Sequence, residues 1–283
     1  TMWITLKISL VTALLSIVGG YPIAYLVSSL QKDKKSRWVF WILLSFWTSF
    51  LVRAFAWIVV LGRNGLANQL LLALGLQDAP SNMLYSFGAV LVGMVHALMP
   101  LAVLTMLSVM ENIDRNLPRA ALTLGARPGT AFWRVYFPLS MPGVAAGAIM
   151  VFVTAVGFFI VPQLLGGRKE TMITQLIIEQ VMQVMNWGFA GAISVLLLIV
   201  VLIVFAIYDK VLGLSTMTGA QSDKSNHSSG FMRQLSEMVL GLLGSISDRL
   251  IALVPRSRKR DLQQGDSFVL RASVVALLVF LSV

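Results

Sequence analysis

Long apolar runs, separated by shorter polar ones, set the pattern of this chain. A helix needs about 20 consecutive apolar residues to cross the hydrocarbon layer of a bilayer. Five runs of that length predict membrane-spanning helices: Met2 to Leu30, Trp38 to Leu61, Met83 to Met110, Leu139 to Val161 and Trp187 to Leu214. A sixth run, Phe268 to Val283, is too short to span. The pattern therefore predicts an all-α polytopic bundle with five full spans and a partial sixth.

The composition agrees with a membrane protein. Of the 283 residues, 57 % are hydrophobic and 12 % are charged, whereas soluble domains carry about 25 % charged residues. The chain has no cysteine, which excludes disulfides, thiolate zinc sites and a cysteine nucleophile. We expect no catalytic residue, no metal site and no bound cofactor.

Basic residues are concentrated on one side of the predicted membrane topology. Most of the 22 lysines and arginines fall in the connections after the first, third and fifth spans, within Lys32 to Arg37, Arg115 to Arg134 and Lys210 to Arg271. Cytoplasmic loops of membrane proteins are enriched in such residues. The net charge of +10 is therefore interpreted as a topology signal, and nucleic-acid binding is not expected. This orientation places Thr1 outside, which predicts a further span upstream in a longer protein.

Three parts follow along the chain. Residues 1–214 form the predicted transmembrane unit, residues 215–265 a cytoplasmic tail, and residues 266–283 the start of a further transmembrane segment. In the tail, a polar linker precedes apolar residues at helical spacing: Phe231, Leu235, Met238, Leu242, Ile246, Leu250 and Leu253. Such an amphipathic helix suits the surface of the inner leaflet, and an ordinary connector is the alternative. A tandem fusion and a lone extra span both fit the final run.

The inner loop after the third span, residues 111–138, predicts two short helices. Asn116 can cap the first helix, and Gly125 offers the positive φ that ends it. Arg127 precedes Pro128, which disfavours helical geometry at the arginine. Pro128 opens the second helix, and we expect Pro138 to end it at the membrane. The prediction is a rigid helical elbow outside the bilayer, suited to transmitting a push from a partner.

The same loop resembles the EAA loop in permease subunits of ATP-binding cassette importers. That pattern is Glu-Ala-Ala, three residues, Gly, nine residues, Ile, one residue and Leu-Pro. Ala120-Ala121, Gly125, Val135 and Phe137-Pro138 reproduce its spacing. Arg119 stands where the family has glutamate, which removes the basis for a salt bridge from that position to the ATPase.

The resemblance implies a type I importer of the bacterial inner membrane. Two permease units, as homologous subunits or fused halves, would bind a dimer of cytoplasmic ATPase subunits, and a periplasmic solute-binding protein would deliver the solute. The chain itself has no Gly-x-x-x-x-Gly-Lys-Ser/Thr motif for ATP. The residues that the resemblance assigns to ATPase coupling are Arg119, Ala120, Ala121, Leu124, Gly125, Ala126, Arg127, Pro128, Phe132, Val135 and Pro138.

Two further segments are similar to the spermidine/putrescine type of these permeases. The first runs from Leu51 to Gly65, and the second from Val161 to Gly167, with Asn186-Trp187-Gly188-Phe189 after it. The resemblance therefore implies a polyamine or a similar small organic solute. Acidic residues that could attract such a cation are few outside the inner loops, namely Asp78, Glu170 and Glu179. Composition alone does not support a polyamine.

Candidates for the translocation pathway come from polar and aromatic residues near or within the spans: Arg53, Trp57, His96, Phe158, Phe159, Gln163 and Glu179. An ionisable residue within a span marks a pathway or a buried pair by default. For Arg53 and for Lys7, a structural role in fixing the helix is the alternative that we favour. His96 lies four residues before Pro100, and helix packing suits it better than proton coupling.

A self-sufficient secondary transporter or channel is the rival interpretation. It requires inverted repeats, broken helices around a midplane site, or acidic residues in the spans. The sequence displays none of these signals. A membrane scaffold without transport activity is a third interpretation, which the helical elbow disfavours.

Overall fold

The computed structural model describes residues 1–75, 79–114 and 116–212. Every regular element in these ranges is a helix or a helical turn. In chain order they are α1 (Met2–Ser29), α2 (Lys32–Trp47), α3 (Phe50–Leu61), α4 (Leu66–Ala73), α5 (Phe87–Met110), α6 (Asn116–Thr123), α7 (Pro128–Ala131), a π-helical turn (Phe132–Tyr136), α8 (Phe137–Gly157), α9 (Ile160–Leu165), a 3₁₀ turn (Arg168–Glu170), α10 (Ile173–Met182) and α11 (Trp187–Leu212). The predictions for residues 215–265 and 266–283 lie outside the described residues.

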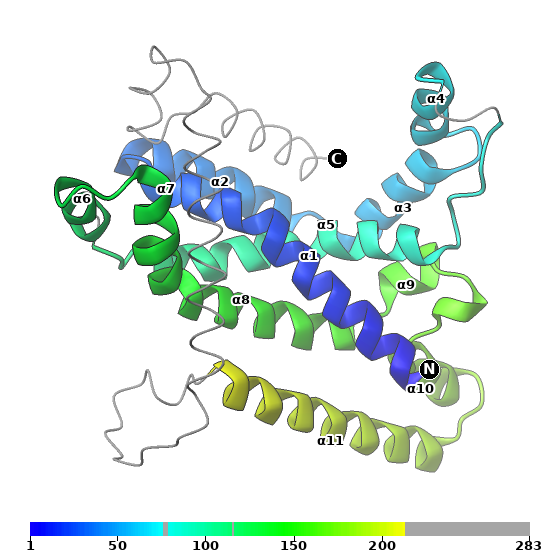
Figure 1. Cartoon of the computed structure of the whole chain (residues 1–283). Coiled ribbons are helices and arrows are strands. Elements are labelled where there is room, and N and C mark those ends of the chain that lie inside the picture. The colour runs from blue at the N-terminus through cyan, green and yellow to red at the C-terminus, as the bar shows by residue number, and fades with distance from the viewer. Residues whose placement is uncertain (76–78, 115, 213–283) are drawn as a thin grey trace.

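Helices α1, α5 and α8 form the core of the bundle. Each of the three packs against the other two (Figure 1). Most side chains of α5 are buried, including Met94, Val103 and Met106. Gly143 of α8 allows a close approach to α5, because a Cβ atom there would lie 2.9 Å from Val109 Cβ and 3.2 Å from the carbonyl oxygen of Met106. Small residues at helix contacts are a common packing device in membranes.

Five helical stretches in the described ranges are long and apolar enough to cross a membrane: Met2–Ser29, Phe50–Ala73, Phe87–Met110, Pro128–Gly157 and Trp187–Tyr208. The all-α bundle with five candidate spans is therefore confirmed. The first, third and fifth of these stretches agree closely with the runs predicted from the sequence. The second and fourth do not.

The predicted second span, Trp38 to Leu61, is wrong as a single helix. The chain leaves helical geometry at Thr48, whose φ and ψ are −64° and 142°, and α3 begins only at Phe50. Thr48 and Ser49 form a polar pair within the apolar run, and such residues favour local backbone bonds over helix continuation. Thr48 Oγ1 donates to the Ser45 carbonyl at 2.7 Å. As a result, α2 and α3 meet at an angle (Figure 1).

The predicted fourth span, Leu139 to Val161, is displaced at both ends. Helix α8 starts at Phe137 and stops at Gly157, and Phe158 is extended with φ −80° and ψ 130°. A short helix, α9, follows at Ile160. The described part of the chain thus contains two broken helices, a signal that the sequence pattern did not display.

The two ends of the bundle carry different elements. Helices α6 and α7 lie at the end where α2 begins, whereas α4, α9 and α10 lie at the opposite end (Figure 1). Side chains along α11 are largely exposed, for example Leu198 and Leu202. Tyr208 Oη of α11 donates to the Ala145 carbonyl of α8 at 2.8 Å. Helix α11 therefore lies beside the core rather than within it.

Candidate functional site

The first candidate site is the inner loop, where α6 forms its first short helix. Asp114 Oδ1 accepts a hydrogen bond from the backbone N–H of Asn116 at 2.9 Å. Asn116 is the first residue of α6 and not the residue before it, so the cap predicted at Asn116 is wrong. Asp114 lies two positions before Asn116, so its carboxylate reaches a free N–H group of the first turn.

Helix α6 ends at Gly125 as the sequence predicts. The φ of Gly125 is +89°, a value that costs a residue with a Cβ roughly 1–2 kcal/mol. The N–H of Gly125 bonds to the Leu122 carbonyl and the N–H of Ala126 to the Ala121 carbonyl, both at 3.0 Å. This pair of bonds is a Schellman motif, which satisfies carbonyls at the helix end.

The second half of the loop differs from the prediction. Arg127 is extended, with φ −75° and ψ 154°, and Pro128 opens α7 as expected. Pro138 does not end a helix, because α7 continues through the π-helical turn into α8. The N–H of Phe137 bonds to the Phe132 carbonyl, five residues back. This wider turn adds one residue before Pro138, which then lies in the first turn of α8, where a missing N–H is tolerated.

An aromatic cluster joins this loop to α1, and we call it the aromatic joint: Tyr21, Tyr25, Phe132, Tyr136 and Phe137. The Tyr25 ring lies 5.2 Å from the Phe132 ring and 4.9 Å from the Tyr136 ring, edge to face in both cases. Tyr21 Oη also hydrogen-bonds with Ser140 Oγ at 2.9 Å. Within the loop, the Phe132 and Tyr136 rings stack on each other. The partner tyrosines on α1 were not predicted.

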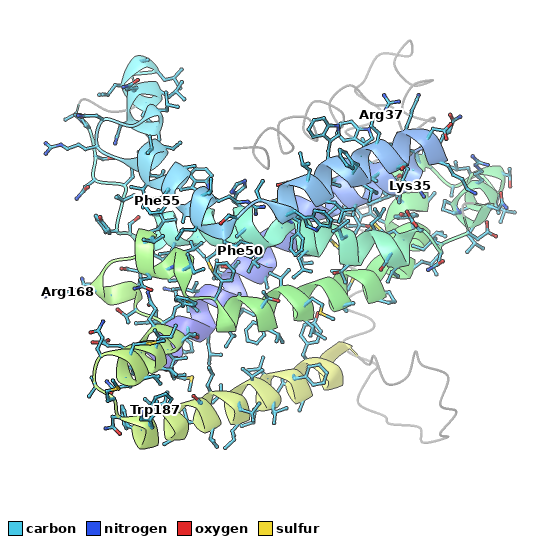
Figure 2. The ribbon with its side chains drawn as sticks, turned by 180° about the vertical axis from the view of Figure 1, so that it is seen from behind. Lys35, Arg37, Phe50, Phe55, Arg168 and Trp187 are labelled. Carbon is cyan, nitrogen blue, oxygen red and sulfur yellow. The ribbon has the colours of Figure 1, made fainter. Side chains whose placement is uncertain are left out.

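The surface of α6 faces away from the bundle. None of its residues is buried, and the Leu124 side chain directly after it is 88 % exposed. Arg119, Ala120 and Arg127 are exposed as well. A helix with one exposed arginine, followed by an uncovered leucine, therefore lies at the end of the bundle where Lys35 and Arg37 lie (Figure 2).

The second candidate site lies between α3 and α5. Arg53 is 4 % exposed, and its Nε donates to Thr48 Oγ1 at 2.7 Å. Its Nη1 donates to the Ala97 carbonyl of α5 over a long 3.5 Å. Arg53 does not extend outward to water, so the expectation that it fixes the helix against carbonyls is supported by these contacts.

Trp57 and His96 are brought together beside it. Trp57 Nε1 donates to His96 Nδ1 at 3.1 Å, and both side chains are buried. This bond links α3 to α5 one helical turn beyond Arg53. The geometry agrees with the helix-packing role expected for His96.

The remaining pathway candidates lie near the second helix break and beyond it. Phe158 contacts Phe50 edge to face, with ring centroids 5.0 Å apart. Phe159 is half-buried and Gln163 is exposed on α9. Glu179 is exposed on α10 and joins no other candidate. The structure therefore gathers Arg53, Trp57, His96 and Phe158 near α3, whereas Glu179 lies apart.

Two residues of this site were not predicted from the sequence: Thr48, which bonds to Arg53, and Phe50, whose ring contacts Phe158. The polar pair Thr48-Ser49 within an apolar run was the available signal. No group of three or more histidine, aspartate or glutamate side chains that could hold a metal ion gathers in the part of the chain that the structure describes.

Most of the chain is similar to known transport permeases. Residues 20–212 match the family described as the binding-protein-dependent transport system inner membrane component. The spermidine/putrescine transport system permease protein PotB of Haemophilus influenzae is 34 % identical over 208 residues, which cover 73 % of each chain. PotB of Escherichia coli strain K12 is 34 % identical over 204 residues, covering 72 % of this chain and 74 % of that protein.

Solved structures share the same fold. A bacterial alginate ABC transporter, in complex with an alginate pentasaccharide-bound periplasmic protein, superposes with a TM-score of 0.60 at 16 % identity. The match covers 74 % of this chain and 76 % of that chain. This likeness shows the fold, whereas the family and PotB matches show a transport permease subunit rather than an enzyme. The chain belongs to the multi-pass inner-membrane permeases of binding-protein-dependent transport systems, the membrane components of bacterial ABC importers.

Proposed function

We propose that α6 and the residues after it form the contact between this permease and a dimer of cytoplasmic ATPase subunits. The observation that carries the proposal is the uncovered Leu124 side chain, 88 % exposed, at the end of a helix with no buried residue. Covering such a large apolar side chain with a partner removes it from water and stabilises the complex. The basic side of the bundle is the side on which an ATPase would bind.

The aromatic joint supplies a route for coupling. Its rings connect the π-helical turn to α1 through Tyr25, and the turn continues directly into α8. A displacement of α6 by ATP-driven closure of the ATPase would therefore move α1 and α8 together. Two core helices would respond to one external push.

We further propose that the candidates gathered near α3 lie along the translocation route. Arg53, Trp57 and His96 join α3 to α5, and Phe158 lies at the break between α8 and α9. A second permease unit would line the opposite side of this route. Phe159 and Gln163 would then line the side of the break toward the outer end.

The proposed solute is a polyamine such as spermidine or putrescine. The support comes from the two PotB relatives, whose names carry that substrate. Aromatic faces and carboxylates are the groups that attract an organic cation. Glu179 is exposed on α10, at the end of the bundle opposite α6 (Figure 1), and is the carboxylate that we propose the solute meets first.

A secondary transporter working without an ATPase is not favoured by the family. The two broken helices alone do not support a secondary transporter, because no carboxylate of the described spans lies beside Arg53 or His96. The external α6, moreover, has no function in a transporter without a motor.

The test is reconstitution of the permease with its ATPase and binding protein in proteoliposomes. In Leu124→Ala we expect the ATPase to co-purify at a several-fold lower yield and ATP-dependent spermidine uptake to fall in proportion. The matched control is Leu74→Ala, another exposed leucine, which lies at the opposite end. Equal ATPase recovery in both variants would contradict the proposed contact, and uptake without ATPase would overturn the importer assignment.

A further inference from the structure

The two helix breaks lie close to each other, since residues beside them are in contact, and Thr48 and Ser49 at the first break are exposed. One separates α2 from α3 at Thr48 and Ser49, and the other separates α8 from α9 at Phe158 and Phe159. Helices α3 and α9 pack together, and the Phe50 and Phe158 rings meet at 90° with centroids 5.0 Å apart. Phe50 lies between the two ends of the bundle (Figure 2). A movement of the backbone at one break should therefore displace the other.

Arg53 joins these breaks to the core. Its Nε donates to Thr48 Oγ1 at 2.7 Å, on the far side of the first break. Its guanidinium carbon lies 5.7 Å from the centroid of the Phe50 ring, the ring that contacts Phe158. The long bond from Nη1 to the Ala97 carbonyl reaches α5. A single side chain thus contacts α5 and both sides of the first break, and reaches the second break through one ring.

In the part of the chain that the structure describes, the groups in contact with this cation are neutral. Among the described residues, no carboxylate lies within ion-pair distance of Arg53, and its buried Nη2 has no hydrogen-bond partner. Burial of a charge without a counter-ion is costly, and an unsatisfied buried donor requires an explanation. Because Nη2 is unbonded and the other acceptors of Arg53 are neutral, Arg53 can change its hydrogen-bond partners when the breaks move.

We propose that Arg53 is a positioning residue that holds the two breaks together and keeps the translocation route shut in the resting transporter. The Thr48, Phe50, Arg53 and Phe158 side chains form the cluster, which we call the gate cluster. When the core helices move, Arg53 exchanges its acceptors and the Phe50–Phe158 contact opens. This inference rests on the proposed function, since it assigns a closed state to the same route.

The experiment uses the natural absence of cysteine from the chain. Gly157→Cys places a reporter at the end of α8, where a Cβ meets no atom within 4 Å. A second reporter, Gln163→Cys, uses an exposed position on α9. The assembled transporter, with ATPase and binding protein, is treated from outside with a membrane-impermeant maleimide in the absence of ATP, and labelling of this subunit is followed over time.

Three variants of the gate cluster are compared with one control. Arg53→Met removes the charge and the hydrogen-bond donors but keeps an unbranched chain as far as the position of Nε. Thr48→Val removes the hydroxyl, which accepts from Arg53 and donates to Ser45, and Phe50→Leu removes the ring. The control is Lys7→Met, because Lys7 is also a cation within a span and its Nζ also lies over a ring, 4.7 Å from the Phe87 centroid. That ring belongs to the first residue of α5 and to neither break.

We expect at least one reporter to be labelled three-fold faster or more in Arg53→Met, a smaller increase in Thr48→Val and Phe50→Leu, and no change in Lys7→Met. Basal ATP hydrolysis without binding protein should rise with labelling. If Arg53→Met does not assemble, the same comparison is decided by the Thr48→Val and Phe50→Leu variants. Unchanged labelling at both reporters, in variants that assemble, would overturn the positioning role. Loss of uptake by the unsubstituted transporter would instead count against the proposed function.

Discussion

At the scale of single residues, close contacts between core helices leave no room for added atoms. Gly143 faces α5 at a point where the neighbouring atoms are a backbone oxygen and the Cβ of a β-branched side chain, Val109. Neither can rotate away, unlike the end of a flexible side chain. Gly157 lies in the same helix but has no atom within 4 Å of an added Cβ. One methyl group should therefore have different consequences at two positions of α8.

We predict that Gly143→Ala destabilises the permease by about 1–3 kcal/mol, the usual cost of overpacking. Gly157→Ala should be neutral or slightly stabilising, because alanine has the higher helix propensity. Thermal unfolding of both variants in detergent, followed by near-ultraviolet circular dichroism, measures the difference. Equal transition temperatures would indicate that α8 does not approach α5 as closely as described.

At the scale of elements, the inner loop presents the exposed surface of α6 and is attached to the core through the aromatic joint. The Schellman motif at Gly125 fixes the end of α6, and the aromatic joint fixes the π-helical turn against α1. Lys35 Nζ and Glu111 Oε1, 3.1 Å apart, add a contact between α2 and the end of α5. An exposed pair of this kind contributes only about 0–1 kcal/mol, so the rings carry most of the attachment.

We predict that Tyr25→Ala uncouples the loop from the core without removing the ATPase contact. The variant should retain the ATPase through α6, while ATP-dependent uptake falls roughly ten-fold, equivalent to about 1.4 kcal/mol of coupling. The ratio of solute imported to ATP hydrolysed measures this. Trp41→Ala is a suitable control, since Trp41 is an exposed aromatic residue whose ring contacts Phe40 of its own helix. A normal ratio in Tyr25→Ala would refute transmission through the joint.

At the scale of the whole molecule, the charge distribution assigns each end of the bundle to one side of the membrane. Lys35 and Arg37 lie at one end, whereas Arg168 and Trp187 lie at the other (Figure 2). The end with more basic residues faces the cytoplasm in bacterial membrane proteins. This orientation also places α6 where ATP is available.

We predict opposite labelling of two single-cysteine variants in membrane vesicles. Asn64→Cys, after α3, should react with an impermeant maleimide only in right-side-out vesicles. Ser36→Cys, in the first turns of α2, should react only in inverted ones. Both positions are exposed, and the chain supplies no competing thiol. The reverse pattern would invert the topology and remove the ATPase from reach of α6.

The sequence by itself determined the fold class, the spans of α1, α5 and α11, and the Gly125 turn. Apolar run length and glycine at positive φ are local properties that need no knowledge of the partner helix. Only the tertiary structure decided where α2 and α8 break, how Pro138 is accommodated, and which residues meet Arg53. Those outcomes depend on side chains distant in sequence, such as Phe50 with Phe158 and Trp57 with His96. An apolar run has the same pattern whether its helix is continuous or broken, because in a membrane both forms bury similar side chains.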